Sequence, residues 1–462
     1  MPTITPIAVH HQVLVNPCDI TSYARDIFPI FTSFLSPQEQ AIAQRVSSAW
    51  KKALFSQESI FPRVQSILFS DENVVARLCE NIHSFPKVTR KFHAILDPSS
   101  DTLSDYVSMV LQVLIIQKPH NIIDFLETIS QEARDAVQYL DFLGIPILSE
   151  YFSAILTSFR NIEIINLVDC STDGNALTMI RSNNKLKKVY LDGCVDIQNV
   201  ALNIFLSKTK ELEILNLSKT CVAGLAFQSF SPFHLKVLDL SECCHLDDSG
   251  LAPLLLQAKQ IEELNLSETE ITGEAFQSFD SSNLKILVLN ACIHLEQRFL
   301  KCLLSQARQL EKLDLSYTRT IGESFEGFNP SNLKMLSLIQ CNDFEDWALK
   351  LLLSRAKQLE ELTLSYTGFT GEELEDFEAL NLKRLDCFSC TNLEDEFLKR
   401  LLSKAKNLEA LNLYNTPITA KAFQGIELPN LKEIIVREVG KLSLTFFKDV
   451  KSLVENFLIN SA

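Results

Sequence analysis

Apolar residues in the second half of the chain follow one short pattern that recurs at nearly regular intervals. The pattern is Leu-x-x-Leu-x-Leu, with Ile replacing some leucines, and its last residues alternate apolar and polar side chains as a half-buried β-strand does. The twelve segments begin at Ile162, Leu186, Leu212, Leu235, Ile261, Leu284, Leu310, Leu333, Leu359, Leu382, Leu408 and Leu431. After a first step of 24 residues the steps alternate between 26 and 23, so the duplicated unit is a pair of segments that spans 49 residues.

Eleven segments carry a small residue, Cys or Thr, at the ninth position. These residues are Cys170, Cys194, Thr220, Cys243, Thr269, Cys292, Thr318, Cys341, Thr367, Cys390 and Thr416. A repeat of 20–29 residues on this core is typical of leucine-rich repeats, and this half of the chain resembles that family. We expect the Cys and Thr side chains to turn inward and form a ladder down a stacked core. Most cysteines would then be buried structural residues, consistent with a reducing compartment.

The connections between the segments alternate between two types. After a Cys the sequence predicts a helix, as in HLDDSGLAPLLLQAKQ, with Asp247 or Asp248 capping its first turn. After a Thr the connection is three residues shorter and supplies aromatic side chains, such as Phe276 and Phe279, to the core. The expected fold is an α/β leucine-rich-repeat solenoid of about twelve repeats, with parallel strands on the concave face and helices on the convex face, behind an α-helical N-terminal region.

Charge alternates along the second position of the twelve segments. These residues are Glu163, Lys187, Glu213, Lys236, Glu262, Lys285, Glu311, Lys334, Glu360, Lys383, Glu409 and Lys432. Because neighbouring parallel strands lie about 4.8 Å apart, each Glu would have a Lys on both sides. The strip could bind a ligand or could be a structural ladder of ion pairs. We favour the structural interpretation, because charges that neutralise one another make a poor steering field.

The first half of the chain predicts helices instead of repeats. We expect a tail over 1–20, a short helical segment over 21–60 and a helical connector over 61–155 that caps the first repeat. The end of the connector, AVQYLDFLGIPIL, resembles the terminal helix pair of BTB domains, and a plain connector is the alternative. The repeats occupy 156–436, and 437–462 caps their other end.

The segment 21–60 carries a second resemblance. IFTSFLSP followed by RVSSAWKKAL is similar to the F-box, at matching spacing from Ser36-Pro37 to Val46 and Trp50. The family's opening Leu-Pro pair falls here on Ser22-Tyr23. The resemblance implies docking on the Skp-type adaptor of a cullin ubiquitin ligase. The docking residues would be Ile30, Phe31, Phe34, Leu35, Pro37, Val46 and Trp50.

Composition limits the classes of partner. The net charge is −15, which argues against nucleic acid or an anionic membrane and suits a basic protein partner. The N-terminal residues have no basic stretch followed by an apolar core, so we expect no secretory signal, and no apolar run approaches 18 residues. Twelve glycines in 462 residues predict few turns with positive φ.

Motifs of enzyme chemistry are absent from the sequence: it has no GxSxG, HExxH, P-loop or GxGxxG element. Cys387 and Cys390 form a CxxC, but they occupy the sixth and ninth core positions, so we expect both to be buried. His245 and His294 occupy the same loop position after a ladder Cys, and they lack His or carboxylate partners at ligand spacing. We therefore expect no enzymatic activity, no metal site and no cofactor.

Target capture is expected on concave positions that face solvent, where exposed aromatic side chains are frequent binding hot spots. The candidates are Tyr190, Asp239, Asp314, Tyr317, Tyr366, Asp386, Phe388 and Tyr414. An aromatic side chain can also simply cover the neighbouring repeat. Tyr317 and Tyr366 hold equivalent positions two strands apart, which suggests a shared patch.

Together the resemblances imply a substrate-recruiting adaptor of a Skp-cullin-F-box ubiquitin ligase in the cytoplasm. The F-box-like segment would dock the Skp-type adaptor, and the repeats would hold an unidentified protein target. Bacteria that live in eukaryotic hosts also make such proteins, so an effector acting in the host cytosol is a further possibility. The alternative is a leucine-rich-repeat scaffold or effector without a link to ubiquitin.

Overall fold

The structure is a computed structural model that describes residues 103–117, 119–181, 185–374, 376–436 and 440–443. The chain divides into two compact units, Met1–Asp141 and Phe142–Ala462. The F-box-like segment 21–60, with its seven expected docking residues, lies outside the described residues, as do the tail and most of the expected C-terminal cap. The domain boundaries stay predictions.

The described part of the first unit consists of three helices and a short strand, and side chains of the first helix bind the backbone of that strand. It contains α7 (Leu103–Gln117), α8 (Asn121–Thr128), α9 (Gln131–Ala136) and β1 (Tyr139–Asp141). Ser104, Ser108 and Gln112 are spaced by four on α7, so they share one face. Ser108 Oγ accepts from the backbone N–H of Asp141 at 3.1 Å, and Gln112 Nε2 donates to its carbonyl at 2.6 Å. The stretch AVQYLDFLGIPIL, expected to resemble a helix pair, therefore contains the strand β1, because side chains of α7 satisfy the backbone groups of that strand.

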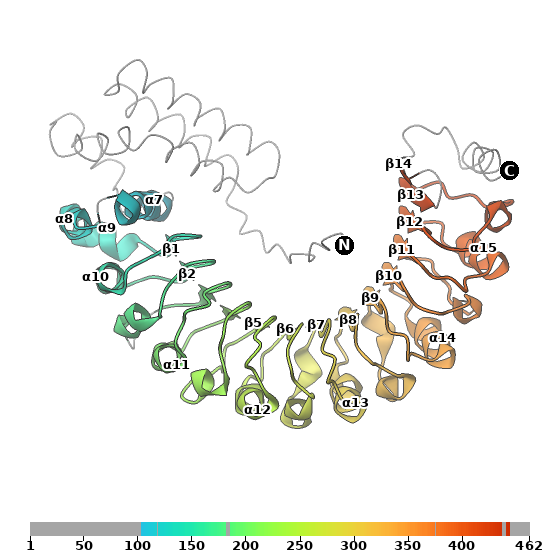
Figure 1. Ribbon diagram of the computed structural model, residues 1–462, viewed down its shortest axis with the longest axis horizontal. Coiled ribbons are helices and arrows are strands. Elements are labelled where there is room, and N and C mark those ends of the chain that lie inside the picture. Colours follow the sequence, from blue (N-terminus) through green and yellow to red (C-terminus); the bar gives the residue numbers. More distant parts are fainter. Residues whose placement is uncertain (1–102, 118, 182–184, 375, 437–439, 444–462) are drawn as a thin grey trace, which may run out of the picture. The chain divides into compact units, whose positions relative to one another are not determined.

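The second unit contains one strand for each of the twelve predicted segments, and each strand begins two residues after the first residue of its segment. Figure 1 shows these strands following one another in chain order. The parallel strands are β2 (Ile164–Asn166), β3 (Lys188–Tyr190), β4 (Ile214–Asn216), β5 (Val237–Asp239), β6 (Glu263–Asn265), β7 (Ile286–Val288), β8 (Lys312–Asp314), β9 (Met335–Ser337), β10 (Glu361–Thr363), β11 (Arg384–Asp386), β12 (Ala410–Asn412) and β13 (Glu433–Val436). Strand β14 (Gly440–Ser443) pairs with β13 in the antiparallel sense.

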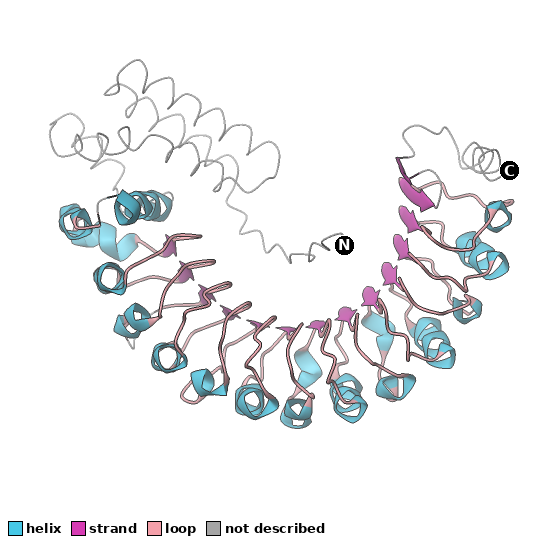
Figure 2. Ribbon diagram, viewed as in Figure 1, coloured by secondary structure: helices cyan, strands magenta, loops and turns pink. Residues whose placement is uncertain are grey.

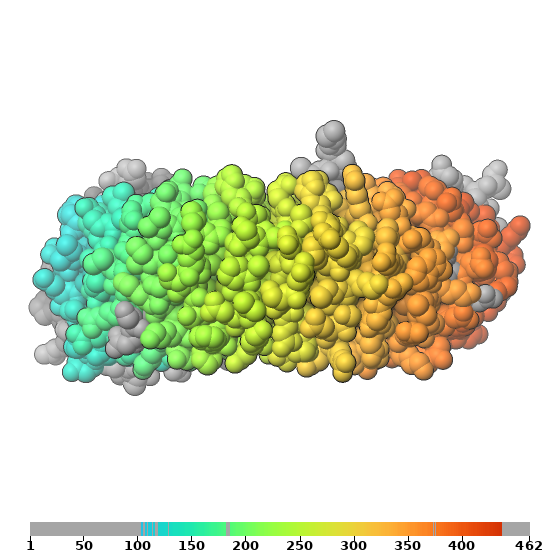
Figure 3. Space-filling model, turned by 90° about the horizontal axis from the view of Figure 1, so that it is seen from below, coloured from blue at the N-terminus to red at the C-terminus, as the bar shows by residue number. Residues whose placement is uncertain are grey.

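The sheet lines the concave side of the second unit, and helices cover its convex side (Figure 2). The middle residue of each strand points into the core, as Leu215, Leu238 and Leu264 do with exposures of 0–1%. These residues are also register partners across β4, β5 and β6. Seen from the helical side, the repeats stack as successive bands in chain order (Figure 3). The predicted solenoid with concave parallel strands is confirmed.

Two types of convex segment alternate, as predicted from the two step lengths. The longer connections form α11 (Asn199–Leu206), α12 (Asp248–Gln257), α13 (Gln297–Gln306), α14 (Asp346–Arg355) and α15 (Asp395–Lys404). The shorter ones form 3₁₀-helices: η1 (Asn175–Met179), η2 (Gly224–Phe227), η3 (Glu274–Ser278), η4 (Ser281–Asn283), η5 (Gly322–Phe325), η6 (Pro330–Asn332), η7 (Glu372–Leu374) and η8 (Ala420–Phe423). Helix α10 (Ser149–Ser158) precedes β2. The first repeat differs from the prediction that a helix follows each ladder Cys, because Cys170 is followed by the 3₁₀-helix η1.

Buried side chains and caps match the expectations for these connections. Phe276 and Phe279 are buried, with exposures of 0% and 2%. Asp247 caps α12 by accepting from the backbone N–H of Gly250 at 2.9 Å. Asp248 has a different role: its carboxylate accepts from the N–H groups of Thr272 at 2.7 Å and Gly273 at 3.0 Å in the next repeat. The first helical residue therefore links one repeat to the following one.

A similar link is found at three other helix starts that lie in 49-residue register with Asp248. Asn199 accepts from Ala223 N–H at 2.8 Å, Gln297 from Ile321 N–H at 3.1 Å, and Asp395 from Thr419 N–H at 2.7 Å. Each bond joins the first residue of a convex helix to the connection of the next repeat. Backbone donors that have no partner in their own short connection are satisfied in this way.

The turn after each strand contradicts the expectation of few positive φ angles. Ten non-glycine residues directly before a ladder position have φ between 55° and 59°: Asp169, Lys219, Glu242, Glu268, Ala291, Tyr317, Gln340, Tyr366, Ser389 and Asn415. The N–H of such a residue donates to the next repeat, as Glu242 does to the Ser267 carbonyl at 2.8 Å. Hydrogen bonding between repeats therefore offsets the cost of the left-handed conformation.

Candidate functional site on the concave face

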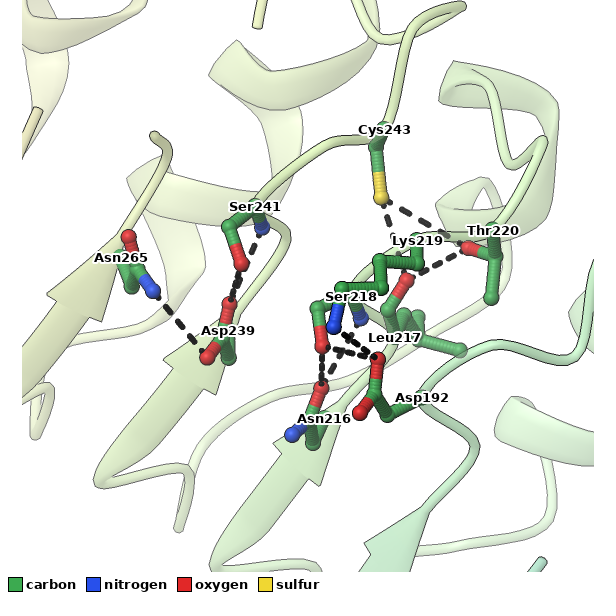
Figure 4. A network of polar contacts seen from close by, with 10 residues as sticks. All are labelled: Asp192, Asn216, Leu217, Ser218, Lys219, Thr220, Asp239, Ser241, Cys243 and Asn265. Carbon is green, nitrogen blue, oxygen red and sulfur yellow. Dashed lines mark hydrogen bonds and ion pairs between the residues drawn. The ribbon is translucent and has the colours of Figure 1, made fainter. Parts of the chain in front are cut away.

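The ladder residues form pairs in the core. Thr220 Oγ1 donates to the Leu217 carbonyl at 2.5 Å, and Cys243 Sγ of the next repeat donates to the same oxygen at 3.1 Å (Figure 4). Thr220 Oγ1 and Cys243 Sγ lie 3.6 Å apart. The pairs Thr269–Cys292, Thr318–Cys341 and Thr367–Cys390 have corresponding distances of 3.8 Å. The predicted inward ladder is present, and each of these four Thr hydroxyls contacts the Cys thiol of the repeat that follows it.

Buried ladder cysteines are poor nucleophiles in this environment. Burial raises the pKa of Cys243, Cys292 and Cys341 to about 11. These thiols are therefore protonated at neutral pH, and the thiolate is the reactive form. Cys387 and Cys390 are both fully buried, as expected for core positions of a CxxC. The hydrogen bond from Cys387 to Cys390, together with burial, raises the pKa of Cys387.

The charged strip is a row of separate ion pairs. Each Lys Nζ contacts the carboxylate of the preceding Glu at 2.6–2.8 Å: Lys187–Glu163, Lys236–Glu213, Lys285–Glu262, Lys334–Glu311, Lys383–Glu360 and Lys432–Glu409. The following Glu acts on the Lys only through longer-range attraction. Each Glu does have a Lys on both sides, as Glu213 has Lys236 and Lys187, but only the Lys across the shorter step forms a close ion pair with it. The charges neutralise one another in pairs.

Polar residues that end the strands fix the turn that follows. Asp239 Oδ1 accepts from the backbone N–H of Ser241 at 3.0 Å and from its hydroxyl at 2.7 Å, and Asp239 Oδ2 accepts from Asn265 Nδ2 at 3.1 Å (Figure 4). Asp314 accepts from Ser316 N–H at 3.0 Å, a turn bond of the same kind. Sequence reasoning missed this role, although its signal is the recurrent Asn or Asp two residues before a Ser.

Asp386 combines a turn bond with a bond between repeats. Its Oδ1 atom accepts from the N–H of Phe388 at 2.9 Å and from the hydroxyl of Ser365 at 2.6 Å. Three expected target-binding carboxylates, those of Asp239, Asp314 and Asp386, thus shape the strand ends. Their contact with a target stays a prediction.

Acidic side chains gather at the ends of β3 to β6. We call Asp192, Asp239, Glu242 and Glu268 the acidic segment. Burial is the main reason that the pKa of Glu242 is raised, and repulsion from the other three carboxylates adds to it, while Lys219 opposes it. Lys219 Nζ lies 4.0 Å from Asp192 Oδ1. This part of the concave face is therefore suited to a cationic group.

Aromatic side chains gather at the ends of β10 to β12. We call Tyr366, Phe388 and Tyr414 the aromatic stack. The ring centroids of Tyr366 and Phe388 are 5.0 Å apart in a tilted arrangement. Those of Phe388 and Tyr414 are 5.3 Å apart, with an interplanar angle of 8°. Tyr366 is 47% exposed and Tyr414 40%, so three consecutive repeats present ring surface to solvent.

The remaining predicted residues lie elsewhere on the same edge. Tyr190 ends β3, and burial raises its pKa. Tyr317 is half-buried and has φ 58°. Tyr366 has φ 59° and contacts Phe388. The patch shared by Tyr317 and Tyr366 stays a prediction.

A cluster outside the ladder escaped the sequence reasoning. Cys221, Cys244 and His245 are exposed, and their Sγ and ring nitrogen atoms lie within 4.8 Å of one another. Neighbouring repeats therefore bring two thiols to His245, which the search for His and carboxylate partners along the sequence did not find. The signal was available, because residues one repeat apart in a solenoid are neighbours.

Comparisons with known proteins agree on the fold. A family model described as a leucine-rich repeat matches residues 231–255. No curated protein sequence gives a significant match. The crystal structure of the Rad7 and Elc1 complex in yeast is similar over 79% of this chain and 97% of that chain, at 19% identity and a TM-score of 0.50.

Two bacterial structures are similar over shorter stretches. The functional domain of InlJ from Listeria monocytogenes, which includes a cysteine ladder, is matched over 67% of this chain and 70% of that chain, with 16% identity and a TM-score of 0.43. A leucine-rich-repeat protein of Leptospira interrogans is matched over 66% and 86%, with 20% identity and a TM-score of 0.43.

Within the described residues, no helix has both the length and the apolar character needed to cross a membrane.

The described part of the chain has twelve consecutive parallel strands in register, convex helices and a leucine-rich-repeat match. The protein is an α/β leucine-rich-repeat solenoid.

Proposed function

We propose that the chain is a protein-binding adaptor that holds a target on the concave face of its repeats. The aromatic stack of Tyr366, Phe388 and Tyr414 carries this proposal, because exposed rings on three successive repeats offer a rigid apolar surface. Tyrosines are enriched among residues that dominate binding energy. They lose little conformational entropy when they are held in advance.

The acidic segment adds selectivity to the proposed surface. Its carboxylates lie on the same strand-end edge as the aromatic stack, several repeats toward the N-terminus. A target with a basic region and an apolar anchor would complement both. The six Glu–Lys pairs would contribute little, because their charges are already paired.

We infer a finer role from the F-box-like segment, namely recruitment of the target to a Skp-cullin-F-box ubiquitin ligase. Its support is the run IFTSFLSP, the spacing to Val46 and Trp50, and the repeats that follow. In this role the chain acts by proximity: it holds a target near a ubiquitin-charged enzyme and supplies no reacting group itself.

A binding assay with a purified Skp-type adaptor tests the finer role. The wild-type chain should bind the adaptor, and Leu35→Asp and Val46→Asp should abolish binding because each places a charge at an apolar docking position. Ser47→Asp is the matched control, since it adds the same charge at a polar position of the same segment. No binding by the wild type would leave a repeat scaffold without a ubiquitin link. Binding that survives Leu35→Asp and Val46→Asp would refute the assigned docking residues.

A further inference from the structure

The exposed cluster of Cys221, Cys244 and His245 is built on a rigid part of the core. Cys221 directly follows Thr220, and Cys244 and His245 directly follow Cys243. Thr220 and Cys243 are buried, contact each other at 3.6 Å and share the Leu217 carbonyl (Figure 4). The two exposed thiols are thus each one residue away from a fixed pair, so the backbone holds them side by side.

We propose that this cluster is a binding site for a thiophilic divalent cation of the Zn²⁺ type. Two thiolates and one imidazole are the ligand types that Zn²⁺ prefers, and the fourth tetrahedral position stays open to water or to a side chain of a partner. Bonds of about 2.3 Å to sulfur and about 2.0 Å to nitrogen put such ligand atoms about 3.5–4 Å apart. The present spacing of up to 4.8 Å therefore closes with small rotations of exposed side chains.

The next pair of repeats provides an internal comparison. The positions 49 residues after Cys221, Cys244 and His245 hold Glu270, Ile293 and His294. There His294 Nε2 lies 2.9 Å from Glu270 Oε2. The same two loops therefore bring their side chains into contact when the residues differ. The repeat backbone thus places these side chains within reach of one another in both pairs of repeats. Only the first pair has two cysteines there, so only the first pair has thiolate ligands for a metal.

These cysteines are also unlike the structural ones. The ladder cysteines are buried and hydrogen-bonded to backbone carbonyls, whereas Cys221 and Cys244 are exposed. At later 49-residue steps the Cys221 position holds Arg319 and Gly368, so the core does not require a thiol there. Packing of the repeats thus leaves the paired exposed thiols unexplained, and metal coordination accounts for them.

A metal titration of the full chain tests the proposal. The reduced, metal-free protein is titrated with Co²⁺, which gives thiolate charge-transfer absorption in the near ultraviolet, and bound Co²⁺ is then displaced by Zn²⁺. The wild type should bind one ion at this site. The variant C221E/C244I, which copies the neighbouring pair of repeats, should lose the signal and weaken binding by on the order of 100-fold or more, since loss of an outer partner alone costs 10–100-fold.

Three further measurements make the test decisive. Cys302→Ser removes a partly exposed thiol outside the cluster and should leave the titration unchanged. His245→Asn, which copies Asn392 at an equivalent position, should weaken binding but retain thiolate absorption. An unchanged titration with C221E/C244I would overturn the proposal. So would a Cys221–Cys244 disulfide that forms in a glutathione buffer even when Zn²⁺ is present, detected by peptide mapping as a loss of about 2 Da.

Discussion

Tyr366→Asn separates the binding role of the aromatic stack from its role in the fold. Tyr366 has φ 59°, a left-handed conformation that costs a non-glycine residue about 1–2 kcal/mol and that Asn adopts more readily. The variant also loses the ring contact with Phe388 at 5.0 Å, and such pairs contribute about 0.5–1.5 kcal/mol. The two effects oppose each other, so the free energy of unfolding should change by less than about 1 kcal/mol.

Binding should respond much more strongly than stability. Truncation of an aromatic hot spot costs about 2 kcal/mol or more, which corresponds to about 30-fold weaker binding. The assay is titration calorimetry of a purified target with wild type and variant, alongside thermal unfolding of each. Gln340→Asn is the control, because Gln340 also has a left-handed conformation, with φ 55°, and is not among the expected target-binding residues. Equal loss of affinity in both variants, or unfolding of Tyr366→Asn, would refute the reasoning.

Two substitutions and one labelling experiment test the ion pairs, the acidic segment and the burial of the ladder cysteines. Lys285→Glu puts like charges where Lys285 Nζ now contacts Glu262 at 2.6 Å, so it should lower the melting temperature more than Lys285→Gln does; equal effects would contradict the ion pair. Glu242→Gln should stabilise the fold at neutral pH, because the folded-state pKa of Glu242 is raised above 4.5. That gain should vanish as the pH falls through the folded pKa and protonation neutralises the wild-type carboxylate; a gain that persists at lower pH would refute the assignment. Cys292 and Cys341, whose pKa is raised to about 11, should react slowly with thiol reagents in the native state, and rapid labelling would contradict their burial.

The periodicity of the sequence predicts the strands and the buried ladder positions, but it does not predict which side chains pair with one another. The strand starts and the buried Cys and Thr positions followed from the 49-residue period, because every repeat must bury the same face. The 49-residue period does not predict that Lys236 forms its close ion pair with Glu213 and not with Glu262. Both Glu residues hold the second position of their segments, so the pattern treats them alike. The two step lengths make successive interfaces different, and only the structure shows which Glu is closer.

The concave site was predicted as a set of positions without their contacts. The sequence predicts Phe388 and Tyr414 as solvent-facing aromatic residues, but their stacking at 5.3 Å depends on side-chain rotamers that a sequence pattern does not contain. The sequence predicts Asp239 as a concave position that faces solvent, and the structure shows its carboxylate accepting hydrogen bonds from Ser241 and Asn265. A charged residue at a strand end thus has a local structural use that composition alone does not reveal.

Site-specific photo-crosslinking tests the central claim, target binding on the concave face, most directly. A photoreactive phenylalanine is introduced at Phe388 in the aromatic stack or at Leu351, which is 43% exposed on the convex helix α14. The crosslinks are formed with a target that co-purifies with the wild-type chain. We expect the target to be crosslinked from Phe388 and not from Leu351. Crosslinking from Leu351 with none from Phe388 would contradict binding on the concave face.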